Sequence, residues 1–198
     1  MNFLAHIYLS GKSDLVKIGN FMADGVHGNK FLELHSEIQK GIFLHRFIDT
    51  FTDAHPYFRR STKRLHANYH HFSGVIVDVF YDHFLAKNWS LYSDEPLEIY
   101  IENFYESLSI HDDLLTEKAR AMMPYMIAQN WLLSYQSIDG IEKILSQMDN
   151  RIKRESNMRF SVHELRIFYQ EFEEDFFIFF NELRVHSAQK LLTLNKEN

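Results

Sequence analysis

Apolar residues recur every three or four positions along most of the chain, which is the spacing of one face of an α-helix. In the segment 14–26, for example, Leu15, Ile18, Met22 and Val26 fall on one such face. Gly, Ser, Asp and Pro residues interrupt the pattern at points where helices commonly begin or end. We therefore expect helices at 14–26, 32–51, 57–70, 75–89, 95–109, 113–135, 138–154 and 161–192.

The last predicted helix carries a stripe of large apolar side chains, which are Leu165, Phe168, Phe172, Phe176, Phe179 and Leu183. Such a stripe packs against neighbouring helices far more often than it binds a cofactor. We predict an all-α, single-domain bundle of seven or eight helices over residues 1–198. Candidate ligands gather in about 1–90, and the second half, about 95–192, is expected to be mainly scaffold.

Composition narrows the class of protein further. Seven Gly and three Pro in 198 residues are too few for the many turns of a β-sandwich or barrel. The chain contains no cysteine, so a metal site must use His and carboxylate ligands. A net charge of −6 argues against broad binding to nucleic acid. The chain has no stretch of 18 consecutive apolar residues, which a membrane span would need, and its first residues do not resemble a secretory signal. We therefore expect a cytoplasmic protein.

Possible metal ligands concentrate at the start of the chain, because nine of the twelve histidines fall within the first 83 residues. His45 and Asp49 are four apart, as are Asp78 and Asp82, so each pair shares a helix face. Carboxylates on the nearly all-apolar helix at 75–89 are costly to bury unless a cation or hydrogen-bond donors satisfy them. This favours a metal site, although such pairs also occur as simple helix-stabilising contacts.

Five ordered blocks resemble the acyl carrier protein phosphodiesterase family, also called holo-acyl-carrier-protein hydrolases. The blocks are 1–6 (MNFLAH), 19–24 (GNFMAD), 41–49 (GIFLHRFID), 52–53 (TD) and 78–85 (DVFYDHFL). The segment 129–132 (QNWL), followed by Tyr135, resembles a further family segment. Together they run from residue 1 to about 135, and the length of the chain fits the whole family domain.

The resemblance implies an all-helical fold distantly related to HD-type metal-dependent phosphohydrolases. It also implies a reaction, the hydrolysis of the phosphodiester that joins 4′-phosphopantetheine to a serine of acyl carrier protein. The products are apo carrier protein and free 4′-phosphopantetheine, and the cofactor is Mn²⁺ or Mg²⁺. Carried onto this chain, the family's metal and catalytic candidates are His6, Asp24, His45, Asp49, Asp78, Asp82 and His83.

Roles follow from the chemistry of phosphodiester hydrolysis, in which a divalent ion activates water and neutralises phosphoryl charge. We expect Asp24 to hold Mn²⁺ together with His6, His45 and Asp82 as metal ligands. The expected catalytic residues are Asp24, Arg46, Asp49, Asp78 and His83. Asp78 or Asp49 would orient an imidazole or the attacking water, Arg46 would clamp the phosphate or pair with Asp49, and His83 would protonate the leaving serine. Asp53 is either a nearby support or a helix cap.

Acyl carrier protein, the implied partner, is a small acidic protein, so docking on an acidic chain requires a local basic patch. The densest basic run supplies Arg59, Arg60, Lys63 and Arg64, and a second run spans 151–154. Two other functions remain open, namely a helical phosphohydrolase acting on a nucleotide or another small phosphodiester, and a non-catalytic helical binding module. The oligomeric state also remains open.

Overall fold

The computed structural model describes residues 1–26, 28, 30–152 and 156–196, and it confirms the predicted all-α class. Within these residues there is no β-strand. The helices are α1 (Phe3–Leu9), α2 (Asp14–Met22), α3 (Ser36–Ala54), α4 (Pro56–Tyr69), α5 (Ser73–Lys87), α6 (Leu97–Ile110), α7 (Glu117–Ala128), α8 (Trp131–Ser134), α9 (Ile138–Arg151), α10 (Val162–Ile167) and α11 (Tyr169–Lys196). Each of the eight predicted ranges contains a helix.

The structure divides the chain more finely than the sequence pattern predicts. Helix α1 lies before the first predicted range, and the ranges 113–135 and 161–192 each contain two helices. Asn130 adopts a left-handed backbone with φ 45° between α7 and α8, a conformation that ends a helix and that Asn tolerates better than most residues. The turn at Phe168 separates α10 from α11.

Several helix starts follow directly from local sequence. The side chains of Ser13, Thr116 and Ser137 accept hydrogen bonds from backbone N–H groups in the first turns of α2, α7 and α9. Pro56 occupies the first turn of α4, where its missing N–H costs nothing. Such N-cap and first-turn residues are the local signals from which helix starts are predicted in a sequence.

Two glycines allow α2 and α3 to pack with their backbones nearly in contact. A Cβ atom at Gly19 would lie 2.2 Å from the carbonyl oxygen of Ile38, and one at Gly41 would lie 2.2 Å from that of Val16. Any larger residue would push the helices apart. The contact matters because Asn20 follows Gly19 directly and His45 lies one helical turn beyond Gly41.

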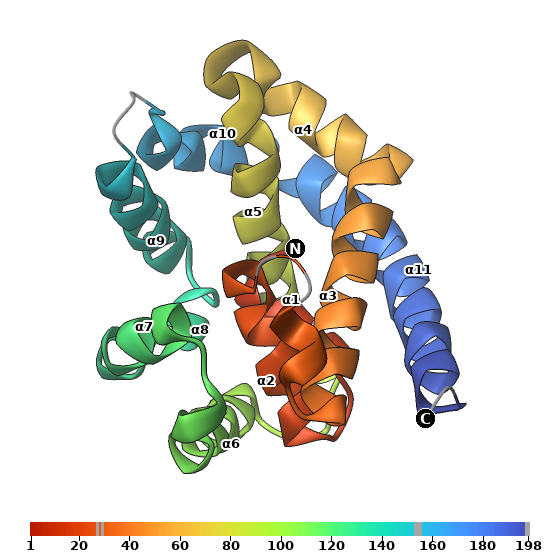
Figure 1. The fold of residues 1–198 in the computed structure, drawn as a ribbon. Helices are drawn as coiled ribbons and strands as arrows, with labels where there is room; N and C mark the ends of the chain where they lie inside the picture. Colours follow the sequence, from red (N-terminus) through yellow and green to blue (C-terminus); the bar gives the residue numbers. More distant parts are fainter. Residues whose placement is uncertain (27, 29, 153–155, 197–198) are drawn as a thin grey trace.

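The long helix α11 runs beside α3, α4 and α5 (Figure 1) and fills the core with its aromatic side chains. Phe172, Phe176, Phe179 and Phe180 are fully buried, which confirms that the aromatic stripe is core. Helices α6 to α9 lie on the other side of α1 and α5 (Figure 1). Among the described residues, no helix combines the length and apolar character needed to cross a membrane. The relation to HD-type enzymes stays a prediction.

Candidate active site

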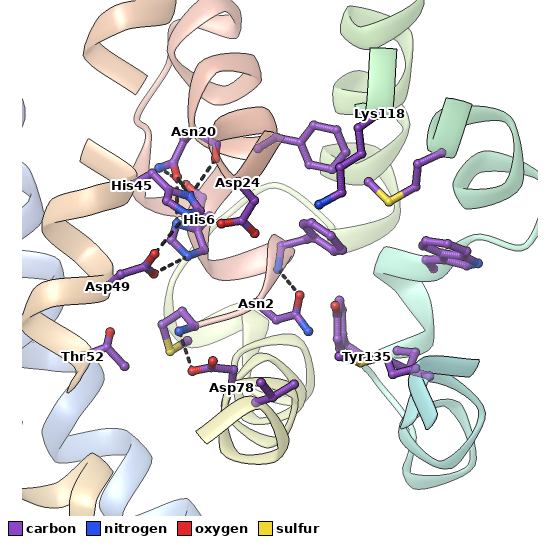
Figure 2. A pocket seen from close by; sticks show the side chains of 18 of the residues that line it. Asn2, His6, Asn20, Asp24, His45, Asp49, Thr52, Asp78, Lys118 and Tyr135 are labelled. Atoms are coloured by element: carbon purple, nitrogen blue, oxygen red, sulfur yellow. Dashed lines mark hydrogen bonds and ion pairs between the residues drawn. The ribbon is translucent and has the colours of Figure 1, made fainter. Parts of the chain in front are cut away.

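A cleft of about 520 Å³ lies between the N-terminal helices and the segment that contains α7, α8 and α9 (Figure 2). One wall carries imidazole and carboxylate groups from α1, α3, α5 and the short 3-10 turn Ala23–Gly25. The opposite wall consists mainly of apolar side chains from α7 to α9. A site of this size can accommodate a small molecule or the extended arm of a larger substrate.

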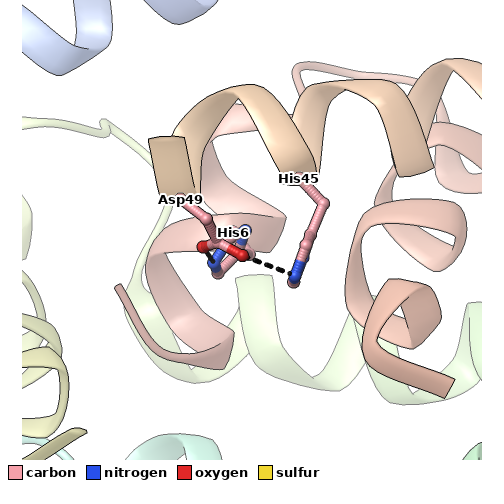
Figure 3. Close-up of side chains that lie close together, drawn as sticks. All are labelled: His6, His45 and Asp49. Carbon is pink, nitrogen blue, oxygen red and sulfur yellow. Dashed lines mark ion pairs between the residues drawn. The ribbon is translucent and has the colours of Figure 1, made fainter. Parts of the chain in front are cut away.

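His6, His45 and Asp49 form a compact cluster on the first wall (Figure 3). One potential ligand atom from each of the three lies within 4.8 Å of the others. Nε2 of His6 is 3.3 Å from Asp49 Oδ1, and Nε2 of His45 is 3.0 Å from Asp49 Oδ2. Asp24 adds a second carboxylate, with Oδ1 3.2 Å from His45 Nε2. Residues from three separate segments therefore meet at one point.

Asn20, which is fully buried, fixes the orientation of both imidazole rings (Figure 2). Its Nδ2 donates to the carbonyl oxygen of His6 at 2.9 Å, so its Oδ1 faces the rings and accepts from His6 Nδ1 at 2.7 Å. His45 Nδ1 donates to the backbone oxygen of Asn20 at 2.9 Å. Both Nδ1 atoms therefore carry a proton, and both Nε2 atoms face Asp49.

The imidazole of His45 lies between the carboxylates of Asp24 and Asp49, and this sets the electrostatics of the cluster. Burial opposes protonation of His45, but its contacts with Asp24 and Asp49 raise its pKa to about 9. The pKa of Asp49 is lowered because hydrogen bonds from both histidines outweigh its burial, and His45 likewise lowers the pKa of Asp24. Burial lowers the pKa of His6. The carboxylates are consequently ionised and able to bind a positive charge.

The donor atoms of the cluster suit a divalent metal ion. Nε2 of His6 faces a carboxylate oxygen of Asp49, and a neutral imidazole in that arrangement leaves lone pair against lone pair unless a proton or a metal cation lies between them. The combination of two imidazoles with carboxylates is a common ligand set for first-row metals. The rings are stacked with centroids 4.2 Å apart, so two protonated imidazoles would repel each other. The cluster is therefore a candidate metal site.

Comparison with known proteins gives the family. The model of the family described as acyl carrier protein phosphodiesterase matches residues 1–183. A protein of that name from Yersinia enterocolitica is 31% identical over 191 residues, covering 96% of this chain and 99% of the relative. One from Salmonella agona is 30% identical over 200 residues, covering 97% and 100%. The chain belongs to the acyl carrier protein phosphodiesterase family. No solved structure matches it significantly.

Two residues predicted for the site, Asp82 and His83, make hydrogen bonds outside the cluster of His6, His45 and Asp49. Asp82, predicted as a metal ligand, is fully buried and accepts hydrogen bonds from the backbone N–H groups of Asn2, Leu4 and Ala5 at the start of α1. His83, predicted as the proton donor, donates from Nδ1 to the carbonyl oxygen of Tyr135 at 2.7 Å, and its Nε2 accepts from Tyr169. Backbone groups satisfy Asp82, and a backbone carbonyl and a hydroxyl group satisfy His83; their predicted roles stay predictions.

Of the other candidates, two line the cleft and one does not. Asp78 lines the cleft and lies 2.6 Å from the α-ammonium of Met1, and Asp53 also lines the cleft. Arg46, predicted to clamp the phosphate, is not among the residues that line the cleft. Its guanidinium lies 4.7 Å from the centre of the Phe31 ring. Arg46 directly follows His45, and adjacent helical positions point about 100° apart, so only one of the two faces the cluster.

The predicted docking surface is only partly available. Arg60 and Arg64 both bind the fully buried carboxylate of Asp175 on α11, so they serve the fold. Arg59 and Lys63 are exposed. In the second basic run, Arg151 lines the cleft, whereas Lys153 and Arg154 lie outside the described residues.

Sequence reasoning missed two features of the site. Asn20 lies within a block that resembles the family, and a fully buried polar residue on an apolar helix face signals a hydrogen-bonding role. The second wall was expected to be mainly scaffold, yet Lys118, Trp131 and Tyr135 line the cleft. Trp131 and Tyr135 belong to the segment that resembles the family at 129–135, so this segment borders the cleft.

Proposed function

We propose that this chain hydrolyses the phosphodiester between 4′-phosphopantetheine and the serine of holo acyl carrier protein. Water attacks phosphorus, the bond from phosphorus to the serine oxygen breaks, and the serine oxygen takes up a proton. Apo carrier protein and 4′-phosphopantetheine result. The observation that carries the proposal is the meeting of His6, His45 and Asp49 at one end of a cleft in a member of this family.

We further propose that His6, His45, Asp49 and Asp24 hold the metal, with Asp49 taking the place predicted for Asp82. When bound, a divalent ion supplies a more acidic water and neutralises charge on the phosphoryl oxygens. The mixture of nitrogen and oxygen donors favours Mn²⁺ over Mg²⁺, since Mg²⁺ prefers oxygen ligands alone.

Residues of the chain itself orient the metal ligands and neutralise the charge of the phosphate. Asn20 holds both imidazoles with Nε2 toward the cleft, which keeps the ligand atoms in place. Lys118 reaches into the cleft from α7 (Figure 2) and supplies a cation for the phosphate, the role predicted for Arg46. Asp78 borders the same space and is placed to orient a water molecule. His83 supports the site from behind by holding the backbone at Tyr135.

For the partner, we propose that acyl carrier protein docks through exposed cations near the cleft. Arg59 and Lys63 remain from the predicted surface, because Arg60 and Arg64 neutralise Asp175. Reversing the charge of both exposed residues should raise KM for the carrier protein and reduce its salt dependence. An unchanged KM would exclude this surface.

The decisive experiment is mass spectrometry of holo acyl carrier protein after incubation with the purified chain and Mn²⁺. We expect the mass of the carrier protein to fall by that of the prosthetic group, with free 4′-phosphopantetheine in solution. A chelator should abolish the change, and replacing the metal should restore it. An unaltered carrier protein in the presence of metal-loaded enzyme would refute the proposal. Turnover of nucleotide diesters in the same samples would then favour the alternative phosphohydrolase.

A further inference from the structure

The two walls of the cleft differ sharply in charge. All the carboxylates among the described residues that line it come from the first half of the chain, on η1, α3 and α5. The wall from α7 to α9 contributes no carboxylate; its lining residues include Met122, Trp131, Tyr135, Ile144 and Met148, with Lys118 and Arg151 as its cations. An anionic group therefore fits between the walls, and an uncharged apolar group fits along the second wall.

The apolar side chains of this wall are only partly covered by the fold. Met122, Trp131, Ile144 and Met148 are each of intermediate exposure, although they pack against the hydrophobic core. A side chain that is half buried and faces a cleft can gain further burial when a ligand enters. The wall thus offers unused apolar surface next to the candidate metal site.

Trp131 is held in a fixed orientation. Its Nε1 donates to Oε1 of Gln129 at 3.3 Å, and the same oxygen accepts from Nε2 of Gln147 at 2.9 Å. The guanidinium of Arg151 lies 5.1 Å from the centre of the indole ring. A ring supported on its edge by a carboxamide and on its face by a cation forms a rigid surface for binding.

We propose that the wall formed by Met122, Trp131, Ile144 and Met148 binds the pantetheine arm of the substrate. This inference rests on the proposed function and names the part of the substrate that occupies the second half of the cleft. The arm is uncharged, with two methyl groups on one carbon and two amides along its length. Its methyl groups match the apolar side chains, and Gln147 offers an amide partner.

The position of the phosphate sets the direction of the arm. The phosphate is the only charged group between the arm and the serine, so it belongs between the His–Asp cluster and Lys118. From there the arm extends along the α7–α9 wall, while the carrier protein stays outside, because a folded domain cannot enter a cleft of about 520 Å³. The wall therefore determines specificity for the arm, and the cluster acts on the diester.

Adjacent methionines on α7 provide a matched test. Met122 lines the cleft, whereas Met123 packs against the core without lining it. For Met122→Ala we expect the ratio of kcat/KM on holo carrier protein to that on bis(p-nitrophenyl) phosphate to fall about tenfold, the loss of one partly buried apolar contact. Met123→Ala should keep the wild-type ratio, and thermal melting of both variants reports any general loss of stability.

A binding measurement tests the wall without turnover. Pantetheine with its thiol methylated lacks a phosphate and a free thiol, so it probes the wall alone. The chain has two tryptophans, and Trp89 is buried. We expect saturable quenching of tryptophan fluorescence in the metal-free protein, lost in Trp131→Phe, with a midpoint about tenfold higher in Met122→Ala but not in Met123→Ala.

The outcomes separate this inference from the proposed function. Suppose that the wild-type protein removes the prosthetic arm, but both methionine variants keep the wild-type ratio of kcat/KM values and the methylated pantetheine causes no quenching. The wall then does not bind the arm. If the wild-type protein leaves holo carrier protein intact, the proposed function itself fails. A fall in the ratio for Met122→Ala alone, together with the matching shift in the fluorescence midpoint, supports the inference.

Discussion

Helices α3 and α5 each carry a pair of acidic or imidazole side chains four residues apart, and the two pairs have different fates. His45 and Asp49 on α3 face the cleft and each other, with Nε2 and Oδ2 3.0 Å apart. Asp82 on α5 is turned inward and binds the backbone of α1, while Asp78 reaches the cleft edge. Identical spacing therefore produces a candidate metal site on one helix and a structural anchor on the other.

The difference depends on which partners remain after the chain has folded. Asp82 meets the unpaired N–H groups at the beginning of α1, which every helix start provides. His45 donates from Nδ1 to the backbone oxygen of Asn20, which turns its Nε2 toward Asp24 and Asp49. The anchor nevertheless serves the site, because α1 carries His6. Helix α3 therefore carries candidate metal ligands, and α5 stabilises the helix that carries His6.

The largest expected effect is that of removing the charge of Asp49. Asp49→Asn keeps the shape of the side chain but weakens metal binding, so we expect kcat/KM on holo carrier protein to fall about a thousandfold. Metal content by atomic emission and far-ultraviolet circular dichroism measure the cause and the fold. Asp53→Asn, on the same helix and at the same cleft, is the matched control, with an expected change within about threefold. Near-normal activity in Asp49→Asn would remove Asp49 from the site.

Asn20 should have the next largest effect, because its side-chain Oδ1 accepts from Nδ1 of His6 at 2.7 Å and from Nδ1 of His45 at 3.1 Å. Asn20→Ala is expected to weaken Mn²⁺ binding by about ten- to a hundredfold, measured by titration calorimetry. Ser10→Ala is its control, since Ser10 Oγ accepts from Asn20 Nδ2 at 2.9 Å and donates to the backbone oxygen of His6 rather than to an imidazole ring. Equal affinities in the two variants would show that the orientation of the imidazoles does not depend on the Asn20 side chain.

Metal affinity should also depend on pH, through the proton on His45. In the metal-free protein the pKa of His45 is raised to about 9 from an ordinary value of 6.5, so a metal must displace that proton at neutral pH. We expect affinity for Mn²⁺ to rise by about tenfold per pH unit from pH 6 to 8 and to level off above pH 9. An affinity independent of pH over this range would exclude His45 Nε2 as a ligand.

The same raised pKa makes a prediction for the stability of the metal-free protein. The folded state binds the His45 proton more tightly than the unfolded chain, so this contribution is complete below pH 6.5 and is lost as pH rises through about 9. Melting temperatures of the metal-free protein should therefore decline over that interval. In Asp49→Asn the decline should be smaller and should end at lower pH, because one of the two carboxylates that raise the pKa of His45 in the folded state is lost.

The sequence predicts the fold better than it predicts which side chains face the cleft. Helical spacing and the caps at Ser13 and Ser137 are local signals, and the structure retains them. His6, Asp24, His45 and Asp49 are candidates in the sequence, and the structure brings them together. Whether a buried acid such as Asp82 meets a cation or an N–H group depends on a helix start 78 residues away. Spacing along one helix contains no such information.

Replacing Asp82, the residue of α5 that binds the start of α1, should mainly lower the stability of the fold. Asp82→Ala leaves backbone N–H groups of α1 without an acceptor, at a cost of about 1–3 kcal/mol. We expect the melting temperature to fall by several degrees, measured by calorimetry, while metal content per folded molecule changes little. Complete loss of metal from a protein that remains folded at the assay temperature would instead identify Asp82 as a ligand.

The smallest effect should come from Arg46, which lies next to His45 in sequence and on a different face of α3. Its guanidinium contacts the Phe31 ring, so Arg46→Ala should cost only about 0.5–1 kcal/mol of stability and change kcat/KM within about twofold. Lys118→Ala is the counterpart, with an expected fall of about tenfold, because Lys118 faces the cleft. Steady-state rates with holo carrier protein measure both. If Arg46→Ala caused the larger loss, Arg46 would reach the phosphate in the complex, and α3 would act on the substrate through two of its faces.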